Sequence, residues 1–137
     1  MKYLCILLAF ITLNYVNAQS NDSITSFPDV EAQFPGGPEG MKTYLMENTE
    51  YPKLAQQLGE EGKVYVKFVV ERDGSLSNFE IIRSSGSKTL DAEALRVVKN
   101  MPDWTPAEKD GEKVRSVCRF PINFTLGKEK KKKRRRR

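Results

Sequence analysis

Hydrophobic and polar residues alternate most regularly in the stretch from Lys63 to Glu71. The apolar residues at every second position there are Val64, Val66, Phe68 and Val70. This two-residue period predicts a β-strand that turns one row of side chains towards a core. The Asp73-Gly74 pair that follows supplies the backbone angles of a tight hairpin turn, so the next strand should return antiparallel to this one.

The predicted returning strand runs from Leu76 to Arg83. Its residues are branched or aromatic at several positions, as expected for a strand beside a core. The inward row is either the one that holds Phe79 and Ile81 or the one that holds Leu76 and Ile82. The alternation alone does not choose between them.

A third, longer alternation runs from Val114 to Leu126 and places Cys118 on its apolar row. It predicts a long closing strand. Pro121 lies within it, and proline cannot donate a hydrogen bond to a neighbouring strand. The closing strand is therefore predicted to form an edge of the sheet along part of its length.

The principal helix is predicted between these strands, where apolar residues recur at spacings of four, seven, eight and eleven. The residues of this stripe are Leu90, Ala94, Val97, Val98 and Met101. Ser87 or Thr89 is available to cap the helix, and Asp91 lies in its first turn, where a carboxylate complements the helix dipole. Pro102 ends it. A loop that contains Trp104, with Trp104 packed on the core, leads to the closing strand.

Two shorter helical segments are predicted before the first strand. Pro38 is tolerated at the start of a helix, and Met41, Tyr44 and Leu45 recur after it at helical spacing. Tyr51-Pro52 interrupts the pattern, and residues 53–58 form a further turn or two. Together these elements predict an α+β domain over residues 40–127, with a small antiparallel sheet of three main strands and helices packed on one face.

The N-terminus has the pattern of a secretory signal peptide over residues 1–18. Lys2 precedes an apolar run from Tyr3 to Val16, and small residues follow up to Ala18. The run is shorter than the about 20 residues that cross a bilayer, so cleavage after Ala18 is predicted in preference to anchoring. Residues 19–39 are predicted to be an extended lead-in with Phe27, Val30 and Phe34 as candidate anchors. The predicted location is the periplasm, with attachment to the inner membrane if the signal stays uncleaved.

The charge of the chain is divided unevenly between the domain and its end. The net charge of the whole chain is +5. The run from Lys128 to Arg137 carries +8, so residues 1–127 together carry −3. Residues 128–137 are predicted to be a disordered basic tail. Such a tail either adheres to an anionic envelope surface or is simply solvated. Export argues against nucleic acid as a partner.

The chemistry of an enzyme is missing from the composition. The chain contains no histidine, which removes the usual general base at neutral pH and the commonest metal ligand. Once Cys5 leaves with the signal peptide, Cys118 is a lone thiol on an inward row. The glycines form no phosphate-binding or dinucleotide fingerprint. We therefore predict no catalytic residue, no metal site and no cofactor.

An ordered set of motifs along residues 34–126 resembles the C-terminal domain of the TonB family. The residues that carry the resemblance are Tyr51-Pro52, Gly62-Lys63-Val64-Tyr65-Val66, Asp73-Gly74, Ser84-Ser85-Gly86, Leu90-Asp91, Trp104-Thr105-Pro106-Ala107 and Phe120-Pro121-Ile122-Asn123-Phe124. The Phe34-Pro35-Gly36-Gly37 lead-in is similar to that of short TonB-like proteins.

The resemblance implies a protein that grips an extended segment, the TonB box, of TonB-dependent outer-membrane transporters. In the family the grip is strand addition at the exposed edge of the last strand, a mode that fits the predicted edge here. The residues predicted to face such a partner are Arg115, Val117, Arg119 and Asn123, with Glu50 and Tyr51 nearby. The alternative is that these residues are only the solvent face of a sheet.

Two departures from the family separate further alternatives. Full-length members keep an uncleaved N-terminal helix that carries a histidine and couples to an inner-membrane motor. They also have a long proline-rich arm. This chain shows neither pattern. The protein is therefore a TonB-like binding module linked to transport, an envelope-adhering scaffold docked by its basic tail, or, with an uncleaved N-terminus, an energy transducer. An open strand edge also allows two copies to pair as a homodimer.

Overall fold

The structure is a computed structural model that describes residues 23–127. The predicted signal peptide and basic tail lie outside these residues. Three helices and five strands follow one another in the described part. Their bounds are α1 Gly37–Asn48, α2 Lys53–Leu58, β1 Gly62–Val70, β2 Leu76–Arg83, α3 Lys88–Lys99, β3 Ala107–Lys109, β4 Glu112–Val114 and β5 Ser116–Phe124.

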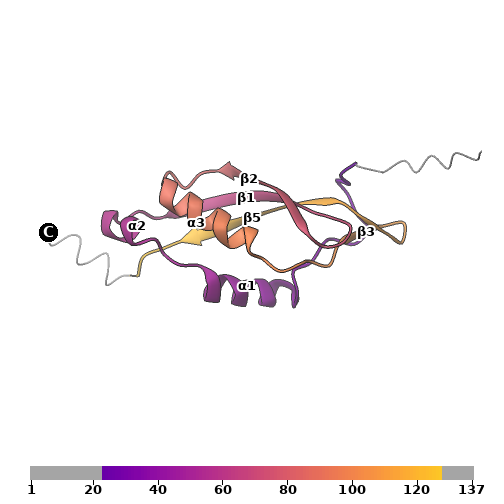
Figure 1. The fold of residues 1–137 in the computed structure, drawn as a ribbon, viewed down its shortest axis with the longest axis horizontal. Coiled ribbons are helices and arrows are strands. Elements are labelled where there is room, and N and C mark those ends of the chain that lie inside the picture. The colour runs from indigo at the N-terminus through magenta and orange to yellow at the C-terminus, as the bar shows by residue number, and fades with distance from the viewer. Residues whose placement is uncertain (1–22, 128–137) are drawn as a thin grey trace, which may run out of the picture.

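The main sheet has three antiparallel strands in the order β2-β1-β5 (Figure 1). Strand β1 lies in the centre because its apolar row is long and unbroken, and it pairs with β5 from Gly62 opposite Phe124 to Val70 opposite Ser116. This ladder contains no register shift. Strand β5 is thus an edge of the sheet, as Pro121 predicted.

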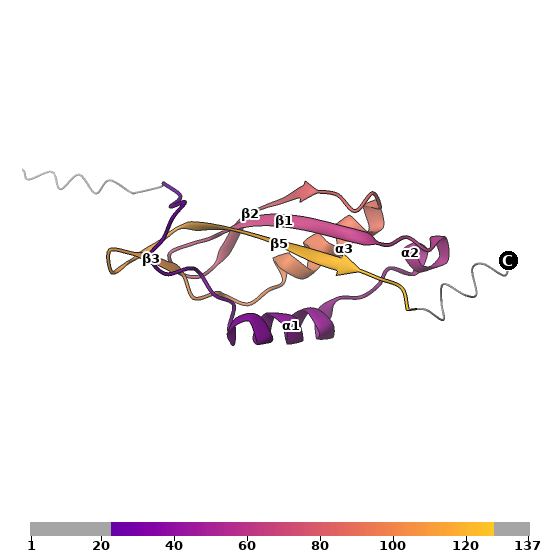
Figure 2. The ribbon, with the colours of Figure 1, turned by 180° about the vertical axis from the view of Figure 1, so that it is seen from behind.

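Helices cover one face of the sheet and leave the other uncovered. Helix α3 lies against β1 and β2 in front of the sheet in Figure 1, and in Figure 2 the sheet is nearest the viewer. Helix α1 lies beside α3 on the β5 side, where the Tyr44 hydroxyl donates to the Val97 carbonyl at 2.9 Å. We call the uncovered face the open face. The predicted α+β fold is confirmed.

The core lies between α3 and the inward row of β1. Val64, Val66, Phe68 and Val70 are fully buried there, and the α3 stripe packs on them. Trp104, predicted to be a packing residue, is 8% exposed and meets Phe68 edge to face, with 5.3 Å between ring centroids. The Ser87 side chain caps α3 by accepting from the Leu90 amide.

The segment predicted as a loop before the closing strand is a second small hairpin. Strands β3 and β4 pair antiparallel, and Asp110 and Gly111 at the turn both have positive φ. The prediction of one strand from residue 114 onwards was also wrong, because Val114 ends β4 and β5 begins at Ser116. The three-residue strands are too short for an alternation to be recognised in the sequence.

The inward row of β2 is settled by an irregularity rather than by simple alternation. Asn78 has a φ of +52° and lies where the register of the β1–β2 ladder shifts. The shift lets Leu76, Phe79 and Ile81 all pack against the core, while Ile82 stays 43% exposed. A bulge of this kind changes which residues share a face, so neither regular row was the correct one.

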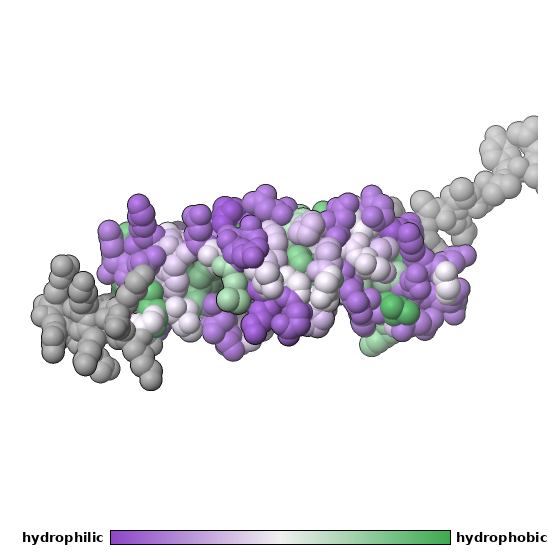
Figure 3. Space-filling view, turned by 90° about the horizontal axis from the view of Figure 1, so that it is seen from below, coloured by the Kyte–Doolittle hydropathy of each residue, from purple (hydrophilic) through white to green (hydrophobic). Residues whose placement is uncertain are grey.

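The lead-in is attached to the domain mainly through its backbone. Val30 pairs with Glu108 and Gln33 with Thr105 in isolated bridges. Of the three candidate anchors, Phe34 is buried, whereas Val30 is half exposed and Phe27 is 84% exposed. Viewed from the side of α1, the surface is mostly hydrophilic with small separate hydrophobic patches (Figure 3). Within residues 23–127 no helix is long and apolar enough to span a bilayer.

Candidate functional site: the outer edge of strand β5

The candidate site is the side of β5 that faces away from β1, which we call the outer edge. In the described residues, the only bridge recorded on this side joins Thr25 to Ser116 at the very start of the strand. Beyond that point no strand within residues 23–127 lies beside this edge up to Phe124. The edge predicted from Pro121 therefore exists, and the part of the chain from residue 23 to residue 127 covers only its first residues.

The direction of the backbone groups along this edge follows from the Thr25 contact. The Thr25 amide donates to the Arg115 carbonyl at 2.8 Å, so that carbonyl points away from β1. Backbone groups alternate in direction along a strand, and the β1–β5 ladder has no irregularity. The carbonyl groups of Val117, Arg119, Pro121 and Asn123 therefore point outwards as well, and so do the N–H groups of the three that are not proline.

Pro121 falls in this outward set, so its missing N–H costs the β1–β5 ladder nothing. The outer edge therefore has no hydrogen-bond donor at residue 121. The donors that remain further along β5 are the amides of Arg119 and Asn123. The carbonyls of Arg119, Pro121 and Asn123 are the acceptors.

Of the predicted partner-facing residues, Arg115 is engaged within the molecule. Its guanidinium Nε lies 2.6 Å from a carboxylate oxygen of Glu71, and a hydroxyl of Ser77 donates to the same carboxylate at 2.5 Å. The Arg115 hydrogen bond is the main cause that holds the pKa of Glu71 below its usual value. Both side chains are at least three-quarters buried. This residue ties the closing strand to the hairpin turn.

Val117, Arg119 and Asn123 share the open face at every second position of β5. Val117 is half-buried beside Val69, whereas Arg119 and Asn123 are exposed. The structure therefore brings three of the predicted residues into one row along the outer edge. Their side chains stand next to the outward backbone groups that a docking strand would use.

Glu50 and Tyr51 lie at the other side of the β5 terminus, in the layer of the helices. The Tyr51 ring meets Phe124 edge to face with 5.7 Å between centroids, and its hydroxyl donates to the Glu60 carbonyl. Burial is the main cause that raises the pKa of Tyr51. Glu50 is exposed, and its amide donates to Glu93 at 2.9 Å. Tyr51 is thus near the end of β5, Glu50 is held to α3, and neither is in the row of Arg119.

Cys118 lies on the helix-facing row, as its place in the alternation predicted. It is half-buried, and burial is the main cause that raises the pKa of its thiol to about 11, with the negative charge of Glu31 adding to the effect. A raised pKa leaves little thiolate at neutral pH. The geometry is that of a packed thiol.

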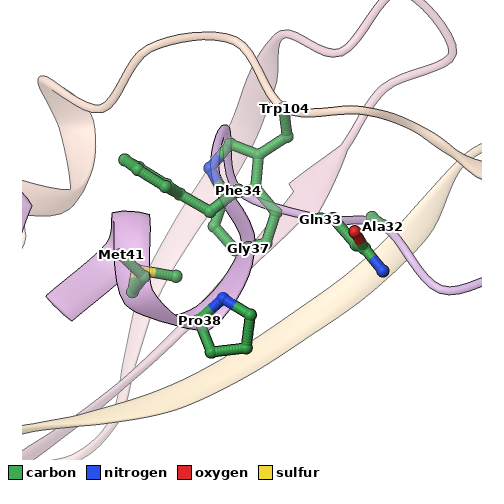
Figure 4. Close-up of a pocket in the computed structure, with 7 residues that line it drawn as sticks. All are labelled: Ala32, Gln33, Phe34, Gly37, Pro38, Met41 and Trp104. Carbon is green, nitrogen blue, oxygen red and sulfur yellow. The ribbon is translucent and has the colours of Figure 1, made fainter.

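Sequence reasoning missed an apolar pocket of about 360 Å³ at the start of α1. Its lining residues are Ala32, Gln33, Phe34, Gly37, Pro38, Met41 and Trp104. Met41 and Pro38 form the helix side, the 32–33 stretch lies opposite, and Trp104 lies behind Phe34 (Figure 4). The Phe-Pro-Gly-Gly lead-in was the signal that could have found it, because the two glycines have positive φ and turn the chain into α1.

The described residues hold no group of three or more acidic, cysteine or histidine side chains that could bind a metal. The features of this site are main-chain groups and surface side chains, which suit recognition of an extended chain.

Residues 47–126 match the family described as "Gram-negative bacterial TonB protein C-terminal". This segment includes α2, α3 and all five strands, and it is more than half of the chain. The chain belongs to this TonB C-terminal family.

Individual relatives agree. The chain is 31% identical over 86 residues to Protein TonB of Helicobacter pylori strain J99, which is 63% of this chain and 29% of that protein. It is 35% identical over 77 residues to Protein tonB2 of Pseudomonas aeruginosa, 56% of this chain and 28% of the relative. The matching segment thus spans less than a third of the relatives.

A solved structure is also similar. The solution structure of a Helicobacter pylori TonB C-terminal domain has 28% sequence identity and a TM-score of 0.49, with 64% of this chain and 78% of that one covered.

Proposed function

We propose that this protein is a periplasmic TonB-like binding module, not an enzyme. In this proposal it captures an extended segment of a TonB-dependent outer-membrane transporter by strand addition and so takes part in energy-coupled transport. The observation that carries the proposal is the outer edge of β5, which keeps outward backbone groups beyond Ser116. Membership of the TonB C-terminal family supports it.

The edge is long enough for a short segment. From Cys118 to Phe124 it would extend for about 24 Å, at roughly 3.4 Å per residue. An added strand would accept from the amides of Arg119 and Asn123 and donate to the outward carbonyls. Because the β1–β5 ladder is regular, these groups are already in line, which lowers the ordering cost of binding.

The predicted contact residues have different parts in this proposal. Val117, Arg119 and Asn123 would contact the side chains of the segment on the open face. Glu50 and Tyr51 would contact it at the end of β5. Arg115 would act by holding the start of β5 through its ion pair with Glu71.

The N-terminus decides whether this module also transduces energy. If residues 1–18 stay attached, they could couple the domain to an inner-membrane motor complex, and cleavage would leave a periplasmic accessory protein. A scaffold held at an anionic envelope surface by residues 128–137 is the alternative from another class. Deletion of the tail separates the two, since only the scaffold would lose its function with peptide binding intact.

The test removes one outward donor while it leaves the β1–β5 ladder untouched. In Asn123→Pro the amide of residue 123 is lost, and proline is tolerated on the outer side of an edge strand. Asn123→Ala is the matched control, because it loses the same side chain and keeps the amide. Each variant is titrated with extended peptides from TonB-dependent transporters while the backbone amide signals are followed by NMR.

We expect peptide binding to shift the amide signals of residues 119 and 123 both in the original protein and in Asn123→Ala. Binding should weaken about fivefold or more in Asn123→Pro, the equivalent of roughly one hydrogen bond. Equal affinity in the two variants would contradict strand addition at this edge. The absence of any shift along β5 with every peptide would contradict it too.

A further inference from the structure

The open face of the sheet carries an unbalanced charge next to the outer edge. The charged residues of the three strands are the cations Lys63, Lys67, Arg83 and Arg119 and a single carboxylate, Glu80. All of them belong to the row that faces away from the helices, because they pair across the sheet with one another or with residues of that row. The face is therefore strongly basic.

The single carboxylate is already paired with a cation between β1 and β2, the two strands further from the outer edge. Lys67 lies directly opposite Glu80 on β2, and its ammonium is 2.9 Å from a Glu80 oxygen. Arg83 lies over the ring of Tyr65, with the guanidinium carbon 5.6 Å from the ring centroid. Within residues 23–127 these contacts leave no carboxylate of the three strands for Arg119, and Glu71 beyond the end of β1 is held by Arg115.

Arg119 is the cation on that strand. Its cross-strand partner on β1 is Lys67, and like charges directly opposite each other are unfavourable. Its neighbours two residues away on β5, Val117 and Pro121, are uncharged. On the remaining side lies the outer edge, where an added strand would place its own side chains about 5 Å away. In the described part of the chain Arg119 therefore has no counter-charge on its outer side, which is the position that a side chain of a bound segment would fill.

The helix-facing side of the same edge has the opposite character. Phe120 and Cys118 are half-buried there, and the negative charge of Glu31 acts on the Cys118 thiol. A carboxylate on that side of an added strand would meet apolar groups and a like charge. An acidic residue is thus favoured on one row of the segment and disfavoured on the other.

We infer that the outer edge of β5 selects an extended protein segment with an acidic residue opposite Arg119, on the row that faces away from the helices, and apolar residues on the alternate row. The inference rests on the proposed strand addition and adds to it the chemistry of the partner. Arg119 is the specificity-determining residue, and backbone pairing supplies the remaining affinity.

The test uses synthetic nine-residue peptides in which Thr and Val alternate. The central Thr is replaced by Glu, Gln or Lys, and in a fourth peptide Glu replaces the Val beside the centre. The purified protein is compared with Arg119→Glu and with Lys63→Glu. The second variant is the control, since it makes the same change of charge on the same face but one strand further from the edge.

We expect the peptide with a central Glu to bind about two- to fivefold more tightly than the Gln peptide, the range typical of an exposed ion pair. The Lys peptide and the peptide with the displaced Glu should bind more weakly than the Gln peptide. Arg119→Glu should reverse the order of Glu and Lys, Lys63→Glu should keep it, and added salt should reduce all the differences.

Three results would overturn the inference in distinguishable ways. Equal affinities for the Glu, Gln and Lys peptides, with the β5 amides shifted by all of them, would remove the acidic preference and leave strand addition standing. No shift of the β5 amides with any peptide would remove both. A reversal of preference in Lys63→Glu but not in Arg119→Glu would place the selectivity on β1 and contradict the role of Arg119.

Discussion

Gly74 shows how one residue joins the hairpin turn to the loop after α3. Its φ is +87°, and its carbonyl accepts from the Trp104 amide at 2.8 Å. A Cβ at this position would lie 2.1 Å from the Trp104 carbonyl oxygen. The glycine is therefore required both by its backbone angle and by the close approach of another segment.

We expect Gly74→Ala to lower the free energy of unfolding by at least about 2 kcal/mol. Gly111→Ala is the matched control, because Gly111 also has positive φ but no atom within 4 Å of an added Cβ. It should lose only about 1 kcal/mol. Urea titration measures both. Equal losses would show that the close approach to Trp104 is unimportant.

Cys118 should react slowly with thiol reagents in the folded protein. With its pKa raised to about 11 by burial, the thiol is almost fully protonated at pH values where an exposed cysteine is substantially ionised. The test is the rate at which the thiol reacts with a disulfide reagent that becomes coloured on reaction. The rate is measured with and without denaturant. A native rate close to the denatured rate would contradict the packed position of the thiol.

At the scale of elements, the ion pair between Arg115 and Glu71 links the start of β5 to the end of β1. Arg115 lowers the pKa of Glu71 in the folded state. The stabilisation is therefore present above the ordinary pKa of a glutamate, 4.5, and is lost as the pH falls through the lower folded pKa.

We expect Glu71→Gln to be less stable than the original protein at neutral pH by the order of 1 kcal/mol. The difference should shrink as the pH is lowered below the folded pKa. Chemical unfolding at a series of pH values measures it. In the Arg115→Met background the effect of Glu71→Gln should be smaller, and an unchanged effect would show that the two side chains are not coupled.

The elements that the sequence predicted are those whose contacts repeat along the chain. The alternation around Val64 and the stripe around Ala94 each reflect one buried face, so a period is enough to place them. Pro121 likewise marked the edge, because a residue without a backbone N–H in the middle of a long strand is tolerated where that position points away from a neighbouring strand.

What the sequence did not reveal depends on contacts between distant segments. The shift at Asn78, the hairpin at Gly111 and the bridge from Thr25 to Ser116 each join residues without a repeating pattern. For the same reason Arg115 was expected to face a partner, although Glu71, 44 positions away, binds it. Pairings of this kind need coordinates.

At the scale of the whole molecule, an edge that can accept a foreign strand can also accept a second copy. We expect weak, concentration-dependent dimers that pair through β5. Sedimentation velocity at increasing protein concentration should detect them, and Asn123→Pro should reduce them while Asn123→Ala should not. A dimer with the same stability in both variants would have another interface.

The two ends of the described chain leave the molecule on opposite sides, as Figures 1 and 2 both show. The central and closing strands run along the line between these ends. Gly62, where the chain enters β1, and Phe124, where it leaves β5, lie opposite each other at one end of the ladder. Tension that reaches these two residues would therefore open the β1–β5 ladder from that end, one hydrogen bond after another. A ladder opened in this way yields at a lower force than one whose strands are pulled past each other with all their hydrogen bonds loaded at once.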